Sequence, residues 1–446
     1  MATRSDGPAT SPTPVRSSVE SHEHARGAEL SPARIRLALL ALALGGFAIG
    51  STEFVAMGLL PNIASDLLPK LYAVSPADAN AQAGWMISAY ALGVVVGAPT
   101  IAAAAARWPR KRLLLWLLVT FTLGTIAAAV APTFGLVLVA RFVAALPHGA
   151  YFGIASLVAA SLMGPGKRGR GVAFVLSGLT IANVVGVPAI TWVGQQAGWR
   201  VAYLAVAAIF ALTFVAVLLA VPWQAGNPEA TMRRELKAFR RPQVWFTLGI
   251  GAIGFGGLFA LYTYIAPIVT DVAGLPEWAV PLMLVCCGLG MTVGNLVGGA
   301  MADRSVKRTM LTFFIVLMVA LVGVGLLAQN AVVLAIGVFL VGASSSAISP
   351  AIQTRLMDVA RDSQSIAAAL NHSALNIGNS VGAYLGGVAI AAGLGYRAPV
   401  WVGLVLSALG LILALSSFAY DRSRARRGLP VTGHTGAVAT VQLSPR

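Results

Sequence analysis

Charged side chains are scarce in this chain. They make up 10% of its 446 residues, while hydrophobic residues make up 57%. A soluble domain carries roughly 25% charged residues, which it needs to cover its surface. A chain so poor in charge cannot cover a water-facing surface, whereas a lipid bilayer favours an apolar one. The composition therefore excludes a soluble globular protein and predicts a membrane protein.

The sequence also lacks the residue patterns of common catalytic and metal sites. Its two cysteines, Cys286 and Cys287, are neighbours in an apolar run, and adjacent helical residues point apart, so we expect no internal disulfide. No zinc-ligand spacing, His/Asp/Cys cluster, phosphate-binding glycine loop or nucleophile–base set is present in the sequence. We therefore expect no enzyme activity, no metal, no cofactor and no ATP drive.

Basic residues outnumber acidic ones, 31 to 15. They form short clusters between long apolar runs rather than one polar face, which argues against nucleic-acid binding. If the N-terminus is cytoplasmic, 27 of the 31 fall in cytoplasmic segments, three fall in outer loops, and only Arg141 lies within a span. Lysine and arginine collect in cytoplasmic loops. The sequence therefore predicts a multi-pass protein with both termini in the cytoplasm.

Twelve apolar stretches are long enough to cross a bilayer as helices, which takes about 17–25 residues. The first is far longer than the core of a signal peptide, about 7–15 residues, so we interpret it as a retained helix. The polar segments 1–34 and 421–446 are expected to be disordered cytoplasmic tails. The predicted spans are 35–60, 83–106, 112–131, 133–163, 171–194, 200–222, 244–270, 279–302, 309–328, 330–354, 364–391 and 397–420.

The two halves of the chain resemble each other. A shift of 197 residues places Gly93 on Gly290 and aligns the basic loops that follow them. A shift of 196 places Asn183 on Asn379. Glycine-rich helices match easily by chance, but the matched loops and asparagines favour a true repeat. Parallel repeats place a transport site near the membrane midplane between the halves. The predicted parts are a six-helix bundle 35–222, a cytoplasmic linker 223–243 and a second six-helix bundle 244–420.

Four motifs resemble those of one transporter family. The segment GAMADRSVKR, residues 299–308, is similar to the signature loop of the major facilitator superfamily, and RFVAALPHGAYFG in the fourth span resembles its arginine motif. GLTIANVVGVP in the fifth span resembles the antiporter signature, although Val187 separates its last glycine and proline. STEFVAMGLLPNIASDL in the first span is similar to the exporter pattern. The resemblance covers about 35–420 and implies the all-α major facilitator fold of twelve helices, within the drug:proton antiporter branch that contains arabinose-efflux and chloramphenicol-efflux permeases.

The same resemblance implies gating roles for two loops. The first-half loop, AAAAARWPRKR, has Ala102 and Ala106 where the family has glycine and aspartate, which leaves its role open. In the second-half loop, Asp303 is expected to brace helix ends through nearby basic residues. The implied gating residues are Arg107, Arg110, Lys111, Asp303, Arg304, Lys307 and Arg308.

Glu53 is the only acidic residue well inside a predicted span, and Arg141 is its basic counterpart. A charged side chain at mid-bilayer costs about 2.5–3.5 kcal/mol on insertion scales, so such residues are candidates for function. Each lies seven residues, or about 10 Å, from the outer end of its helix. They meet if the first and fourth helices adjoin, as the family fold implies. We expect Glu53 to bind the proton and, by resemblance, Arg141 to support coupling. The alternative is a static ion pair.

Other polar residues in the spans have two interpretations each. His148 follows Arg141 by seven residues and shares its helical face, which suits a proton relay or a helix–helix hydrogen bond. The eleventh span carries His372, Asn376 and Asn379 on one face, and together with Asn183 they line a substrate cavity or join helices.

An aromatic stripe marks the seventh span. Phe255, Phe259 and Tyr262 recur at spacings of four and three, so they share a helical face. In a transporter such a stripe binds an apolar substrate by stacking. The alternative is that it faces lipid or a neighbouring helix.

We therefore predict a monomeric, proton-coupled antiporter of the bacterial inner membrane. Its partners are protons, membrane lipids and a small hydrophobic or neutral substrate, such as the drug chloramphenicol, exported by alternating access. An efflux permease for sugars or nucleoside-like metabolites is the alternative substrate class, and a uniporter or symporter the alternative mechanism. A membrane enzyme or sensor is disfavoured because no catalytic set and no long soluble domain are present.

Overall fold

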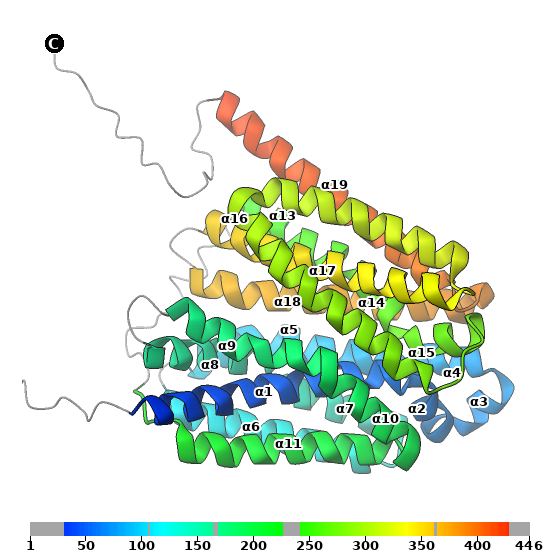
Figure 1. Ribbon diagram of the computed structural model, residues 1–446, viewed down its shortest axis with the longest axis horizontal. Helices are drawn as coiled ribbons and strands as arrows, with labels where there is room; N and C mark the ends of the chain where they lie inside the picture. The colour runs from blue at the N-terminus through cyan, green and yellow to red at the C-terminus, as the bar shows by residue number, and fades with distance from the viewer. Residues whose placement is uncertain (1–30, 106–107, 164–167, 226–240, 361–363, 428–446) are drawn as a thin grey trace, which may run out of the picture.

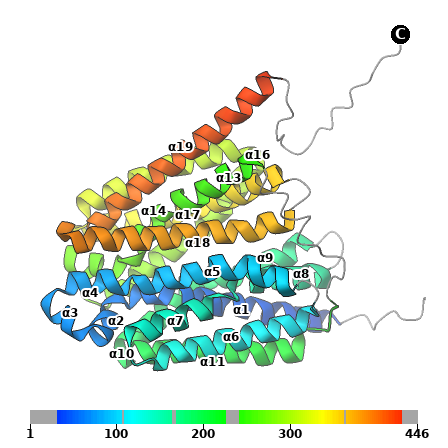
Figure 2. The ribbon, with the colours of Figure 1, turned by 180° about the vertical axis from the view of Figure 1, so that it is seen from behind.

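The computed structural model describes residues 31–105, 108–163, 168–225, 241–360 and 364–427, and this part of the chain is helical with no strand. The predicted tails up to residue 30 and beyond 427, most of the predicted linker, and Arg107 lie outside the described residues. Figures 1 and 2 show a bundle in which the start of the first helix and the end of the last lie at one end. We call this the terminal end and the other the opposite end.

The first half is built from long helices and short connecting ones. Prolines begin the short helices between the first two spans, where the missing N–H is no loss. The elements are α1 (Pro32–Gly58), α2 (Leu60–Leu67), α3 (Pro69–Val74), α4 (Pro76–Ala83), α5 (Trp85–Ala105), α6 (Arg110–Val130), α7 (Phe134–Ala145), α8 (His148–Met163), α9 (Arg168–Ile181), the π-helix η1 (Ala182–Gly186), α10 (Val187–Ala197) and α11 (Trp199–Ala220).

The second half repeats this plan with more helix breaks in its first span. The first of those breaks falls in a glycine-rich segment that forms a π-helix. The elements are α13 (Pro242–Gly249), η3 (Ile250–Gly254), α14 (Gly256–Thr263), α15 (Ile265–Pro267), η4 (Ile268–Val272), α16 (Ala279–Leu327), α17 (Ala331–Ala360), α18 (Gln364–Ala389), η5 (Ile390–Leu394) and α19 (Ala398–Arg426).

The number of membrane crossings follows from α16. Eleven helices of the described residues are long and apolar enough to span a bilayer, and α16 is one of them with 49 residues. At about 1.5 Å per residue it is more than twice the roughly 30 Å of a hydrocarbon core. Its backbone leaves the helical conformation at Ser305, and Figure 1 shows the chain doubling back there. The described residues therefore make twelve crossings, which confirms the predicted count.

The two halves pack their helices in the same way. A Cβ atom at Gly93 would overlap the carbonyl oxygen of Phe142, and one at Gly290 would overlap that of Phe339. Both members of the second pair are 197 residues after those of the first, the shift found in the sequence. The same relation holds for Gly97 with Leu146 and Gly294 with Ala343. The repeat is therefore a repeat of tertiary packing, which confirms two pseudo-symmetric bundles.

Among the described residues, hydrogen bonds between the halves lie from the middle of the bundle to the opposite end. There Asn80 Nδ2 donates to the hydroxyl of Tyr396 at 2.8 Å, and Gln195 Nε2 donates to the carbonyl of Glu277 at 3.0 Å. At the terminal end, Arg110 instead binds Gln224 within the first half. The halves are thus fastened to each other near the opposite end.

Two predicted boundaries are wrong. The helix α17 continues to Ala360 rather than ending at 354, and α19 continues to Arg426 beyond the predicted limit of 420. Both extensions carry charged residues, which lowered the hydropathy on which the predictions were based. The structure pairs Arg355 of the first extension with Asp421 of the second, as described below.

Candidate functional site

The carboxyl group of Glu53 lies between the two halves. The second part of α1, from Gly45 onward, is almost entirely buried, and Glu53 itself is 6% exposed. From the second half, Asn379 Nδ2 of α18 donates to Glu53 Oε1 at 3.4 Å. From the first half, Nδ1 of His148 on α8 lies 4.0 Å from Oε2. One carboxyl group therefore contacts residues from both bundles.

Arg141 of α7 lies against α1, as the depth argument required, but it does not pair with Glu53. It is 1% exposed, and its Nη1 donates to the backbone carbonyl of Thr52 at 2.8 Å and to the Thr52 hydroxyl at 3.3 Å. Its Nε and Nη2 have no hydrogen-bond partner among the described residues. The guanidinium instead faces the ring of Tyr90 at 4.3 Å and that of Tyr203 at 5.6 Å. The static ion pair considered from the sequence is thus absent from the described residues.

His148 connects Glu53 with two further side chains. Its Nδ1 lies 3.3 Å from the hydroxyl of Tyr90, and its ring packs against Phe152 with centroids 5.4 Å apart. The ring of His372 from α18 stacks on Phe152 at 5.8 Å and lies 6.5 Å from His148. His372 therefore adjoins the proposed proton-coupling residues rather than a separate substrate cavity.

The three asparagines predicted for the cavity do not form one cluster. Asn379 contacts Glu53, whereas Asn376 Nδ2 donates to the carbonyl of His372 one turn earlier, at 3.0 Å. Asn183 lies in η1, against the point on α16 where Gly288 makes room for its carbonyl. Side-chain oxygens of all three have no hydrogen-bond partner among the described residues. They remain acceptors for a ligand, at different places along the interface.

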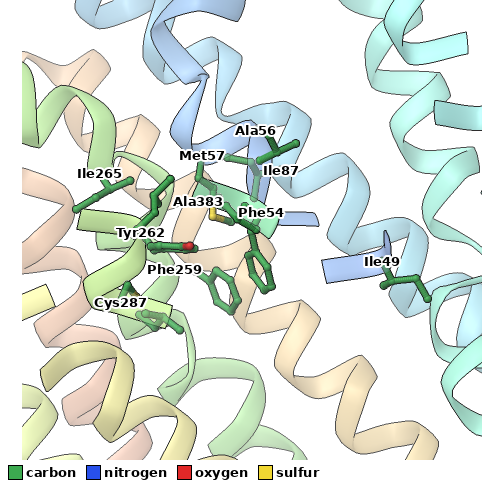
Figure 3. Packing of buried hydrophobic residues seen from close by; sticks show 14 of the residues in the cluster. Ile49, Phe54, Ala56, Met57, Ile87, Phe259, Tyr262, Ile265, Cys287 and Ala383 are labelled. Carbon is green, nitrogen blue, oxygen red and sulfur yellow. The ribbon is translucent and has the colours of Figure 1, made fainter. Parts of the chain in front are cut away.

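The aromatic stripe of the seventh span faces the first helix. Phe54, the residue after Glu53, stacks on Phe259 with centroids 6.2 Å apart and meets Tyr262 edge-on at 5.8 Å. Phe255 packs on Phe259 at 5.5 Å. Figure 3 shows Phe54 directed toward Phe259 and Tyr262 of α14. The stripe is buried between the halves and does not face lipid, which leaves the interpretations of substrate binding and of helix packing.

The antiporter-like segment in the fifth span also packs against α1. Its residues Ala182–Gly186 form the π-helix η1, and a Cβ atom at Gly186 would overlap Phe47 and Ser51. The glycine thus lets this segment approach α1 within one turn of Glu53. Segments of π-helix occur frequently at functional sites.

The proposed gating residues lie at the terminal end. Lys111 Nζ donates to the carbonyl of Leu218 at 2.8 Å, and Arg110 binds Gln224, so both fasten α6 to the end of α11. The side chains of the second-half loop are exposed and make no hydrogen bond or ion pair within the described part of the chain. They are Asp303, Arg304, Lys307 and Arg308. The expected bracing by Asp303 is therefore not found among the described residues.

Sequence reasoning missed a second buried arginine. Arg355 was placed in a loop, but it lies within α17, is 4% exposed, and forms an ion pair with Asp421 of α19. It also donates to Gln243 Oε1 of α13 at 3.3 Å. Arg141 is therefore not the only basic residue buried in the helical core. The one sequence signal was an aspartate, Asp421, at the end of the last helix.

Tyr90 and Phe54 were also missed, because an aromatic residue in an apolar span carries no signal of its own. The described residues contain no group of three or more His, Cys, Asp or Glu that could hold a metal ion.

Comparison with known proteins identifies the family. The profile of the Major Facilitator Superfamily matches residues 42–304 and 278–444. The inner membrane transport protein YdhP of Escherichia coli K12 is 39% identical over 384 residues, covering 86% of this chain and 96% of that protein. A chloramphenicol resistance protein of Streptomyces lividans is 33% identical over 382 residues, covering 85% and 95%.

A third relative and a solved structure are also similar to this chain. The putative transporter AraJ of Escherichia coli K12 is 31% identical over 388 residues, covering 86% of this chain and 95% of that protein. The crystal structure of a D-xylose-proton symporter superposes with a TM-score of 0.70 at 16% identity, covering 89% of this chain and 98% of that one. At that identity the superposition concerns the fold alone. On these matches and the twelve-helix architecture, the chain belongs to the Major Facilitator Superfamily, a family of membrane transporters.

Proposed function

We propose that this chain is a proton-coupled antiporter that exports small hydrophobic or neutral molecules. The observation that carries the proposal is the position of Glu53, a buried carboxyl group held between Asn379 of one half and His148 of the other. A group that contacts both halves changes their interaction when it gains or loses a proton. Alternating access in this family requires such a change, because the halves rock about the site between them.

The effect of protonation follows from the charge of the Glu53 carboxyl group. An ionised carboxylate accepts the amide hydrogen bond of Asn379 more strongly than the protonated acid does. Arg141, anchored one residue away on the Thr52 carbonyl, supplies a positive charge that moves with α1. Proton loss therefore tightens the contact between Glu53 and α18, and proton uptake loosens it. Protonation in this way drives the halves between their two arrangements.

A substrate competes with the proton through the neighbouring residue. Phe54 follows Glu53 in the same helical turn and forms an aromatic surface with Phe259 and Tyr262. An apolar molecule that inserts between these rings displaces α1 and with it the carboxyl group. Apart from Glu53 and Arg141 the neighbouring groups are aromatic rings, imidazoles and amides, which favours hydrophobic or neutral substrates. The relative named as a chloramphenicol resistance protein supports a drug-like substrate.

A second substrate class has its own support. The buried side-chain oxygens of Asn183 and Asn376 accept no hydrogen bond from described residues. Such acceptors suit the hydroxyl groups of sugars or nucleoside-like metabolites. A panel of both compound classes in one flux assay separates the two.

We also propose the orientation and the energy source. The terminal end faces the cytoplasm, because 27 of the 31 lysines and arginines belong to that side. The chain then lies in the bacterial inner membrane as a monomer, uses the proton gradient without a cofactor, and binds no nucleic acid. The contacts between the halves near the opposite end close the protein toward the outside in this conformation.

Flux measurements with Glu53→Gln test the proposal. The amide keeps the size of the side chain and an oxygen that accepts from Asn379, but it cannot exchange a proton. In vesicles with an imposed pH gradient, we expect the variant to insert normally and to lose chloramphenicol-coupled proton flux. Glu277→Gln, which alters an exposed carboxylate before α16, is the matched control and retains coupling. Unchanged coupling in Glu53→Gln refutes the proposal.

A further inference from the structure

One tyrosine of α5 contacts two of the three residues proposed to couple protons. Tyr90 is 1% exposed. Its hydroxyl lies 3.3 Å from Nδ1 of His148, and its ring lies beneath the Arg141 guanidinium at 4.3 Å. The sequence motifs of the family assigned no role to this residue.

The ring of Tyr90 stabilises the Arg141 guanidinium, whose hydrogen-bond donors are only partly satisfied. Two of its guanidinium nitrogens, Nε and Nη2, have no acceptor among the described residues, although the side chain is buried. The negative face of an aromatic ring attracts a cation, and the attraction is larger where water is excluded. Tyr90 thereby holds the guanidinium beside Thr52, the residue that precedes Glu53.

The hydroxyl contact bears on which nitrogen of His148 carries the proton. Nδ1 lies within reach of the Tyr90 hydroxyl at 3.3 Å and farther from Glu53 Oε2 at 4.0 Å. A hydroxyl that donates to Nδ1 makes this nitrogen an acceptor and leaves the proton of the neutral imidazole on Nε2. Tyr90 and Glu53 thus compete for the same nitrogen.

The helix that carries Tyr90 also reaches the second half. Ser88 donates to the carbonyl of Ser380 on α18 at 3.2 Å, and the residue before Ser380 is Asn379, which binds Glu53. A shift of α5 against α18 therefore moves Tyr90 relative to Asn379, the partner of Glu53 in the second half. The geometry thus places Tyr90 beside the contact that changes when the halves move.

We propose that Tyr90 is a positioning residue of the proton-coupling site, which fixes Arg141 through its ring and His148 through its hydroxyl. The proposal rests on the proposed antiport function for its transport consequences, but its geometric content stands alone. Among the described residues in contact with His148 or Tyr90, the other charged or imidazole groups are Glu53 of α1, Arg141 of α7 and His372 of α18. The charged residues of α6 and α9 are at the terminal ends of those helices.

Spectroscopy tests the geometry without transport. The chain has five histidines, so nitrogen NMR of histidine-labelled protein is tractable, with His148 assigned from the spectrum of His148→Gln. We expect the Nε2–H tautomer in the unaltered protein and a loss of that preference in Tyr90→Phe. A Nδ1–H tautomer in the unaltered protein, or an unchanged signal in Tyr90→Phe, overturns the proposal.

Transport measurements then distinguish the ring contact with Arg141 from the hydroxyl contact with His148. Tyr90→Phe keeps the ring, so we expect exchange to persist with its pH profile displaced by about half a pH unit or more, as loss of one hydrogen bond implies. In a His148→Gln background the same change adds nothing. Tyr90→Leu also removes the ring and lowers exchange about tenfold at every pH, because Arg141 loses its partner. An effect of Tyr90→Phe that is equally large without His148 contradicts the assignment. Absence of coupled flux in the unaltered protein defeats the antiport function instead, and leaves the NMR result to decide the role of Tyr90.

Discussion

At the scale of single residues, two arginine–aspartate pairs differ mainly in burial. The side chains of Arg355 and Asp421 are 5% and 14% exposed, whereas those of Arg200 and Asp66 are 37% and 48% exposed. Removing one partner of a buried pair leaves an uncompensated charge and costs about 3–5 kcal/mol. An exposed pair contributes about 0–1 kcal/mol. Loss of one partner is therefore costly for the first pair, at the junction of α13, α17 and α19, and nearly neutral for the second.

This contrast gives a stability prediction. Asp421→Asn keeps an oxygen for the hydrogen bond from Gln243 but removes the charge that neutralises Arg355. We expect its thermal unfolding temperature in detergent to fall clearly, while the matched Asp66→Asn variant unfolds close to the unaltered protein. Equal shifts for the two variants would show that burial does not control the strength of these pairs.

At the scale of helices, glycines set how closely neighbours approach. In α16, a Cβ atom at Gly294 would overlap the backbone of Ala343, whereas one at Gly299 would meet nothing within 4 Å. In the first half, Gly97 and Gly153 differ in the same way. Each half therefore offers a matched pair of positions, a glycine where alanine fits and a glycine where a whole helix must move to admit it.

A set of four alanine substitutions tests this packing. Gly294→Ala and Gly97→Ala are expected to destabilise the protein by about 1–3 kcal/mol, the usual cost of overpacking. Gly299→Ala and Gly153→Ala are expected to be neutral or slightly stabilising, because alanine favours helix. Thermal unfolding of the four variants checks the order. Different losses for Gly294→Ala and Gly97→Ala would contradict equivalent packing in the two halves.

At the scale of the whole molecule, the twelve spans and the repeat could be predicted because hydropathy and spacing are local properties. The partner of Arg141 could not be predicted in this way. The distance of a residue from a helix end fixes its height in the membrane, but not the direction in which its side chain points. Neighbouring residues differ in direction by about 100° in a helix of 3.6 residues per turn. That rotation decides that Arg141 binds Thr52 and that Asn379 binds Glu53.

Contacts between helices that are far apart in the sequence could not be predicted either. Hydropathy ends a helix before Arg355, because it cannot register the neutralising charge of Asp421 on another helix. The stacking of Phe54 on Phe259 joins the two halves and has no local sequence signature. What escapes sequence reasoning here is therefore the contact between bundles, and such contacts form most of the candidate site.

The contacts between the halves near the opposite end lead to a conformational prediction. Burial, together with the nearby carboxylates Asp271 and Asp78, raises the pKa of Tyr396 to about 12, although the hydrogen bond from Asn80 acts the other way. A tyrosine with a raised pKa stays neutral until the pH approaches that value. The bond between Asn80 and Tyr396 is therefore insensitive to pH across the physiological range. This bond is therefore not itself the pH-sensitive contact, and Glu53, deeper in the interface, is the group proposed to start an opening that depends on pH.

Spin labels at Val74→Cys and Leu394→Cys, both exposed near the opposite end, report this opening when Cys286 and Cys287 are replaced by serine. In labelled protein that carries Glu53→Gln and no other change at the interface, we expect one short distance between the labels from pH 6 to 9. Tyr396→Phe removes the acceptor of Asn80 and is expected to add a longer distance at every pH, whereas Tyr384→Phe, on an exposed ring of α18, is expected to change nothing. A pH-dependent distance in the Glu53→Gln protein would place the pH sensor elsewhere. No longer distance in Tyr396→Phe would mean that the remaining contacts between the halves keep the opposite end closed without this bond.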